Sequence, residues 1–163
     1  MIDHHTVTIE IPNDREVVLT RRFNAPRALV FDALTKPALL MRWYGPPGAM
    51  EVCESDTRPG GAWRYVTKLK NGTTVSQFGV YTEVSAPGRF VRTERWDDWD
   101  PGETLVTTEL VEHDGVTTMT SSMVFPSREV RDVVLKGGLT PKATNEFYER
   151  LDEVLRGVGV SGS

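Results

Sequence analysis

Residues 6–11 alternate between hydrophobic and polar positions with a period of two and are rich in β-branched side chains, which predicts a strand. Residues 16–23 form a second extended run. The Pro-Asn-Asp segment at 12–14 is typical of a turn between them. We therefore expect the chain to begin with a pair of strands.

The hydrophobic spacing then changes to a helical one. Apolar residues recur with this spacing over 29–34, and Asn24 is the expected N-cap. Thr35 is the expected N-cap of a second short helix at 37–44, which the Gly-Pro-Pro-Gly segment at 45–48 ends. The pattern predicts two short helices after the strands.

Residues 49–126 are divided by turn-forming pairs into β-rich runs. Asn71-Gly72 and Asp114-Gly115 are strong signals for two-residue hairpins. The expected strands lie at 49–56, 62–69, 73–84, 89–96, 103–112 and 116–125. Because each run is joined to the next by a short turn, we expect a six-strand antiparallel meander.

The last part of the chain returns to helical spacing. Ser127 is the expected N-cap of a helix that stops or kinks at Gly137-Gly138. Thr140 is the next expected cap and precedes Pro141 at a first helical position. One apolar stripe then runs along 141–156, which predicts an amphipathic helix.

The order of elements predicts an α+β domain in which a curved antiparallel sheet is wrapped around the long C-terminal helix. A sheet of this length needs one face covered, and only the C-terminal helix is long enough to cross it. The two short helices would close one end. A curved sheet and a single helix do not fit along their whole length, so the gap between them is a natural small-molecule site.

Composition narrows the class of protein. The chain has 163 residues and 39% hydrophobic positions, which fits one domain over 1–156 with a flexible tail at 157–163. The single cysteine excludes a disulfide framework within one chain, and the net charge of -4 argues against nucleic acid as a partner. We find no apolar run long enough for a membrane span and no signal-peptide pattern, so we expect a cytoplasmic location.

Four stretches of the chain resemble a known family. They are RFNAPRALVFDALT at 22–35, MRWYGP at 41–46, RPGG at 58–61, and PSREVRD at 126–132 followed by Gly138 and YERLD at 148–152. In this order they resemble the helix-grip fold of the START-like, Bet v 1-like (SRPBCC) superfamily. Within it, the chain is most similar to single-domain homologues of the C-terminal domain of the activator of the heat-shock-protein-90 ATPase.

The resemblance implies a helix-grip fold but leaves the function open. The superfamily includes ligand carriers, aromatases and cyclases, lipid-transfer domains and co-chaperone domains. Because one fold hosts many functions, the residues of the site have to decide between them.

Residue types that carry catalysis or bind metals are few and scattered. His4, His5 and His113 are not expected to face the gap, and Cys53 has no evident histidine partner. The acidic segment 97–103 lacks the spacing of a calcium loop. We expect no catalytic residue, no metal and no cofactor.

Aromatic and methionine side chains are the best candidates for a cavity wall, because they combine apolar bulk with polar handles or flexibility. Trp63 and Tyr65 share one strand face, whereas Phe78 and Tyr81 lie on opposite faces unless a bulge near Gly79 intervenes. A buried Glu94 would be costly unless paired. The candidate ligand-binding residues are Trp43, Tyr44, Trp63, Tyr65, Phe78, Tyr81, Glu94, Trp96, Met119, Met123, Phe147 and Leu151.

The leading hypothesis is a binding module for a small hydrophobic molecule, such as an aromatic, lipid or polyketide-like ligand. The first alternative is a cyclase-like, aromatase-like or hydrolytic enzyme, whose acid-base groups would come from Arg64, Tyr65, Tyr81, Glu94 and Glu109. The second is a co-chaperone of heat-shock protein 90, which we do not expect of a lone domain. An exposed edge strand could also pair two copies into a homodimer.

Overall fold

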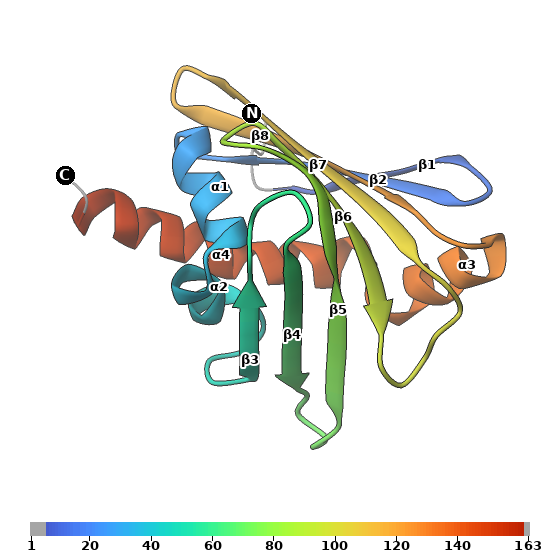
Figure 1. Ribbon diagram of the computed structural model, residues 1–163. Coiled ribbons are helices and arrows are strands. Elements are labelled where there is room, and N and C mark those ends of the chain that lie inside the picture. Colours follow the sequence, from blue (N-terminus) through green and yellow to red (C-terminus); the bar gives the residue numbers. More distant parts are fainter. Residues whose placement is uncertain (1–5, 162–163) are drawn as a thin grey trace.

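A single eight-stranded antiparallel sheet curves over the long C-terminal helix (Figure 1). The computed structural model describes residues 6–161, with side chains to residue 157. The strands are β1 (Thr8–Asn13), β2 (Glu16–Phe23), β3 (Met50–Ser55), β4 (Ala62–Lys68), β5 (Thr74–Ser85), β6 (Arg89–Trp96), β7 (Thr104–His113) and β8 (Val116–Val124). The helices are α1 (Arg27–Thr35), α2 (Pro37–Trp43), α3 (Arg128–Gly137) and α4 (Pro141–Ser161).

The predicted meander is confirmed as β3 to β8, and the first two strands complete the sheet. The strand order is β1-β2-β8-β7-β6-β5-β4-β3, so the chain's first hairpin pairs with its last strand. β2 and β8 pair along their length, from Glu16 opposite Val124 to Phe23 opposite Thr117. This pairing joins segments about 100 residues apart, and local hydrophobic spacing holds no information on it.

The helices occupy one face of the sheet. Figure 1 shows α4 running across the concave face, with α1 and α2 at one end and α3 at the other. On α4 the buried side chains include Leu151, Val154 and Leu155, which belong to the predicted apolar stripe, and also Tyr148, which does not. The fold is therefore the expected helix-grip arrangement.

The predicted helix caps were right at one end of the chain and wrong at the other. Ser127 caps α3, because its Oγ accepts a hydrogen bond from the Val130 backbone N–H at 3.2 Å. Asn24 and Thr35 do not cap α1 and α2, whose N-cap positions are Pro26 and Lys36. Thr35 is the last residue of α1, and its hydroxyl donates to the Phe31 carbonyl within that helix.

Helix α4 is longer than the stripe predicted. It continues to Ser161, through residues 157–161, where we expected a flexible tail. Each residue added to an existing helix gains one backbone hydrogen bond, whereas an interior glycine lowers helix stability by only about 1 kcal/mol. The glycines in this segment therefore do not end the helix. Residues 162–163 lie outside the described part of the chain.

A buried ion pair fixes α4 to the sheet. The two terminal nitrogens of Arg21 on β2 donate to the two carboxylate oxygens of Asp152 on α4, at 2.9 and 2.8 Å. Both residues are buried, and the Arg21 guanidinium lies 4.9 Å from the centroid of the Phe23 ring. A planar two-bond contact of this kind sets the orientation as well as the distance of the helix.

Candidate functional site

A cavity of about 650 Å³ lies between the concave face of the sheet and α4. Its wall is built from inward-facing positions of β2 and of β4 to β8, and from the four helices α1 to α4. The aliphatic and sulfur-containing members of the wall are Leu19, Leu34, Leu40, Val75, Val106, Met119, Met123, Val133, Val134, Leu139 and Ala143. The volume and the apolar character are those of pockets that hold drug-sized ligands.

The exposed part of the wall lies between the β6–β7 loop and the junction of α3 and α4. Trp99 is 38% exposed and Val133 is 53% exposed, and both line the cavity. Gly137 and Gly138 at the end of α3 also line it and are exposed. The ring of Trp99 lies 5.4 Å from that of Trp96, centroid to centroid. The mouth therefore lies at this junction.

Most of the candidate residues from the sequence lie in the cavity wall. Trp43 and Tyr44 come from the end of α2, and their rings contact Phe147 of α4 at centroid distances of 5.1 Å. The complete set of predicted residues in the wall is Trp43, Tyr44, Tyr65, Glu94, Trp96, Met119, Met123 and Phe147.

The other candidates lie elsewhere. Tyr81 and Leu151 are fully buried in the core, where the Tyr81 hydroxyl bonds to Ser55 Oγ at 2.8 Å. Phe78 lies on the opposite face of β5, with the Arg64 guanidinium 5.7 Å from its ring centroid. The side chains of β5 therefore alternate regularly from Phe78 to Tyr81, so these two residues lie on opposite faces. The bulge in β5 comes later, between Tyr81 and Glu83.

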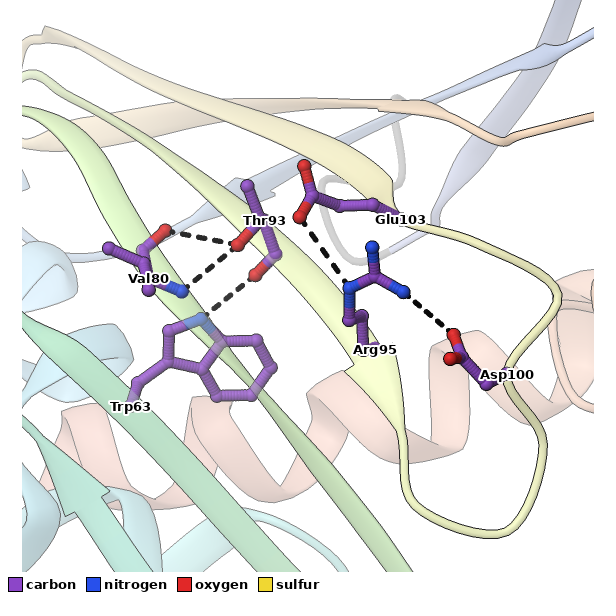
Figure 2. Close-up of polar contacts among 6 residues, drawn as sticks. All are labelled: Trp63, Val80, Thr93, Arg95, Asp100 and Glu103. Carbon is purple, nitrogen blue, oxygen red and sulfur yellow. Dashed lines mark hydrogen bonds and ion pairs between the residues drawn. The ribbon is translucent and has the colours of Figure 1, made fainter.

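Trp63 is buried behind the cavity wall rather than in it. Its indole Nε1 donates to the Thr93 carbonyl at 3.0 Å (Figure 2). Gly79 of β5 is the residue paired with Trp63, between Trp63 and the strand of Thr93. A Cβ at Gly79 would lie 1.9 Å from that carbonyl oxygen and 2.8 Å from Nε1. The Thr93 hydroxyl meanwhile accepts from the Val80 N–H at 3.0 Å. The absence of a side chain at position 79 makes room for the indole.

A chain of polar side chains crosses one part of the wall. The Tyr44 hydroxyl donates to Gln77 Oε1 at 2.9 Å, and Gln77 Nε2 donates to Glu94 Oε1 at 3.1 Å. Burial raises the pKa of Glu94, against the opposing effects of Arg92 and Gln77. The same loss of water raises the pKa of Tyr44 well above its usual range.

Arg92 is next to this chain on the same inward face of β6. Its Nη1 donates to the Tyr65 hydroxyl at 3.0 Å, and its guanidinium carbon lies 3.9 Å from the Trp63 ring centroid. Burial tends to lower the pKa of Arg92, but Tyr65, Tyr81 and Glu94 outweigh it, and the net shift is upward. Burial also raises the pKa of Tyr65 to about 12. The arginine is therefore charged and the tyrosine neutral near pH 7.

The candidate residues from the sequence omit five polar residues of the wall, which are Gln77, Arg92, Thr108, Ser121 and Thr144. Arg92 is two positions before Glu94, so strand parity alone could have placed both on the inward face. Gln77 depends on the pairing of β5 with β6, and Thr144 on the rotation of α4, which a single sequence does not specify. The Thr144 hydroxyl has no hydrogen-bond partner among the described residues.

His113 and Cys53 lie outside the wall. His113 is exposed and contacts Asp114 at 3.2 Å, whereas His4 and His5 lie outside the described residues. Burial raises the pKa of Cys53 to about 11, so its thiolate is disfavoured. Within residues 6–161 we find no cluster of three metal-binding side chains, and no helix there is long and apolar enough to cross a membrane.

Comparisons with known proteins agree on the fold. Residues 24–156 match the family described as "Activator of Hsp90 ATPase homolog 1-like protein". A protein from Rhodobacter sphaeroides has a similar structure, with a TM-score of 0.84 and 29% identity over 93% of this chain and 99% of that one. Protein Ms6760 from Mycobacterium smegmatis has a TM-score of 0.79 and 25% identity, over 91% of this chain and 96% of that one.

A more distant structure is an HSP90 activator from Plasmodium falciparum. It has a TM-score of 0.60 and 22% identity, over 77% of this chain and 88% of that one. At this identity the likeness concerns the fold alone. No curated protein was found to match the chain.

Proposed function

Because the chain belongs to the family of Activator of Hsp90 ATPase homolog 1-like proteins, and because its helix-grip fold encloses a cavity, we propose that it binds a small apolar molecule there. The observation that carries this proposal is the cavity of about 650 Å³ between the sheet and α4. Its wall is mostly aliphatic and aromatic, with a small polar cluster at Tyr44, Gln77, Arg92 and Glu94. Apolar walls with few polar groups are typical of small-molecule sites.

A neutral fluorescent probe, N-phenyl-1-naphthylamine, tests the proposal. We expect saturable binding to the unmodified protein. Ser121 of β8 lines the cavity and is buried, so a phenylalanine there would project its ring into the cavity and occupy part of it. We expect Ser121→Phe to weaken probe binding by about tenfold or more, equal to about 1.4 kcal/mol.

The matched control is Thr120→Phe, which adds the same ring to the neighbouring position of β8. Strand alternation turns Thr120 to the opposite face, and it is not part of the wall. We expect its probe affinity to stay within about twofold of the unmodified protein, or about 0.4 kcal/mol. Equal weakening by both variants, or no saturable binding at all, would contradict the proposal.

A second candidate function is catalysis on the bound molecule, and the presence of Arg92 and of a Glu94 of raised pKa in the same cavity wall favours it. A guanidinium can polarise a carbonyl group, and a protonated carboxyl group can supply a proton to it. The other acid-base candidates from the sequence, Arg64 and Glu109, are on the outer face in ion pairs with Asp97 and Arg89. Mass spectrometry of bound ligands before and after incubation tests this: conversion lost in Glu94→Gln supports it, and unchanged ligands refute it.

A further inference from the structure

The cavity contains one basic and one acidic side chain. Among the described residues of its wall, Arg92 is the only lysine, arginine or histidine, and Glu94 is the only aspartate or glutamate. Both come from the inward face of β6. A buried guanidinium is costly in an apolar surrounding unless a partner satisfies it. The hydrogen-bond partners that the Arg92 guanidinium lacks therefore indicate which chemical group a ligand would have to supply.

Arg92 has donors that the protein does not use. Nη1 bonds to Tyr65, while Nε is shielded from solvent and has no hydrogen-bond partner within residues 6–161. No carboxylate oxygen of the described chain lies within ion-pair distance of the guanidinium, Glu94 included. The Trp63 ring below it and the Tyr65 hydroxyl beside it hold the cation in place. Arg92 is thus a positioned cation without an anionic partner.

The neighbouring carboxyl group of Glu94 makes no ion pair with Arg92, although its charge acts on the guanidinium from a distance. Glu94 already accepts a hydrogen bond from Gln77, and burial raises its pKa, which favours the uncharged form. Arginine stays protonated under the same conditions. The other groups facing this region, Tyr44 and Tyr65, are neutral near pH 7. The Arg92 guanidinium is therefore the group of the cavity wall that complements a negative charge.

We propose that the ligand is an apolar carboxylic acid whose carboxylate binds the Arg92 guanidinium and whose body lies against the apolar wall. This inference rests on the proposed function and names the chemical class of the ligand. Charge-assisted hydrogen bonds between guanidinium and carboxylate are strong and directional. The apolar body would lie against Met119, Met123 and Phe147, which line the same cavity.

Three naphthalene compounds that differ only in their polar group test the inference. They are 2-naphthoate, its neutral amide 2-naphthamide, and the cationic 2-(aminomethyl)naphthalene, each titrated at pH 7 against bound N-phenyl-1-naphthylamine. We expect 2-naphthoate to bind about tenfold or more tightly than 2-naphthamide, the difference that a charged hydrogen bond typically makes. Equal binding of the two, or tightest binding of the amine, would overturn the inference.

Matched variants locate the charge that is responsible. Arg92→Met should abolish the preference for acid over amide while still binding the neutral probe, which also shows that the variant is folded. Arg95→Met removes the same charge from the same strand, but Arg95 pairs with Asp100 and Glu103 on the other face (Figure 2). That control should keep the preference. An acid preference that survives Arg92→Met would refute the inference.

A second variant keeps the inference testable if Arg92→Met does not fold. Glu94→Gln leaves Arg92 intact and removes the nearest competing carboxyl group, so the acid-to-amide preference should rise severalfold. An unchanged or lower preference would contradict the assignment. If the neutral probe binds in the cavity but no acid preference exists, only this inference fails; if no compound binds, the proposed function fails with it.

Discussion

The guanidinium carbon of Arg92 lies 3.9 Å from the centroid of the Trp63 ring, so the one cation of the cavity wall is stacked on a buried indole. The indole is itself fixed by its hydrogen bond to the Thr93 carbonyl on the same strand as Arg92. Trp63 does not line the cavity, so its expected effect on a ligand is the positioning of Arg92. This arrangement makes the polar part of the site depend on core packing behind it.

Replacing Trp63 should therefore affect stability and selectivity together. Trp63→Phe removes the N–H donor to Thr93 and weakens the cation–π contact, so we expect about 1–3 kcal/mol loss of unfolding free energy in urea. The preference for 2-naphthoate over 2-naphthamide should also fall severalfold, because Arg92 loses its support. Trp99→Phe, at the partly exposed mouth, is the control and should cost less than about 0.5 kcal/mol. A destabilised Trp63→Phe with full acid preference would show that its role is structural only.

Adding a methyl group at Gly79 should disrupt the same region. A Cβ there would lie 1.9 Å from the Thr93 carbonyl oxygen, so the backbones of β5 and β6 would have to separate. We expect Gly79→Ala to lower the unfolding free energy by about 2 kcal/mol or more, at the upper range of overpacking.

Gly137 is the matched comparison for Gly79. It ends helix α3, and no atom from elsewhere in the described chain lies within 4 Å of the place that a methyl group would take there. Gly137→Ala should therefore leave stability unchanged or raise it by up to about 1 kcal/mol. Equal urea midpoints for the two alanine variants would show that position 79 is not crowded as described.

Much of the fold could be predicted from turn signals and hydrophobic periodicity. Hairpin pairs such as Asn71-Gly72 separate the strands, and alternation placed Trp63 and Tyr65 on one inward face. The pairing of β2 with β8 was not predictable, because it depends on contacts between distant segments. The same is true of the Arg21–Asp152 ion pair, which neither β2 nor α4 reveals alone.

The site was less predictable than the fold, for a physical reason. Periodicity identifies residues that face inward, but it does not distinguish a side chain that lines a cavity from one packed behind it. Trp63 and Tyr81 face inward, yet hydrogen bonds to Thr93 and Ser55 hold them in the core. Arg92 faces the cavity because an indole and a tyrosine hydroxyl from another strand accommodate its charge.

The raised pKa of Glu94 predicts a specific pH dependence. The folded state holds this proton more tightly than the unfolded state, so stability should fall as pH rises above the ordinary glutamate value of 4.5. Glu94→Gln keeps an acceptor for Gln77 and has no charge to bury. Its melting temperature should exceed that of the unmodified protein at pH 7, and the difference should shrink toward pH 4.

The control for this pH series is Glu109→Gln, on the exposed face of β7 in an ion pair with Arg89. This substitution should not produce a stabilisation that grows with pH, because water already solvates the carboxylate. Thermal unfolding between pH 4 and pH 8 compares the three proteins. A Glu94→Gln variant that is less stable at pH 7 would mean that the native site uses the ionised carboxylate.

The Arg21–Asp152 pair should be essential for docking α4. Arg21→Met leaves the Asp152 carboxylate buried without its bidentate partner, so we expect a loss of about 3–5 kcal/mol. The double variant with Asp152→Leu should recover part of that loss. Lys36→Met removes an exposed ion pair with Asp32 and should change stability by less than about 0.5 kcal/mol. Similar urea midpoints for Arg21→Met and Lys36→Met would contradict the role of the pair.

The most direct test of ligand binding in the cavity uses ¹³C-labelled methionine methyl groups and 2-naphthoate. Met119 and Met123 line the cavity, whereas Met41 on α2 is half exposed and lies outside the wall. The account predicts intermolecular nuclear Overhauser effects from the naphthyl protons to Met119 and Met123, and none to Met41. Contacts to Met41 alone, or none to Met119 and Met123 at saturating ligand, would contradict it.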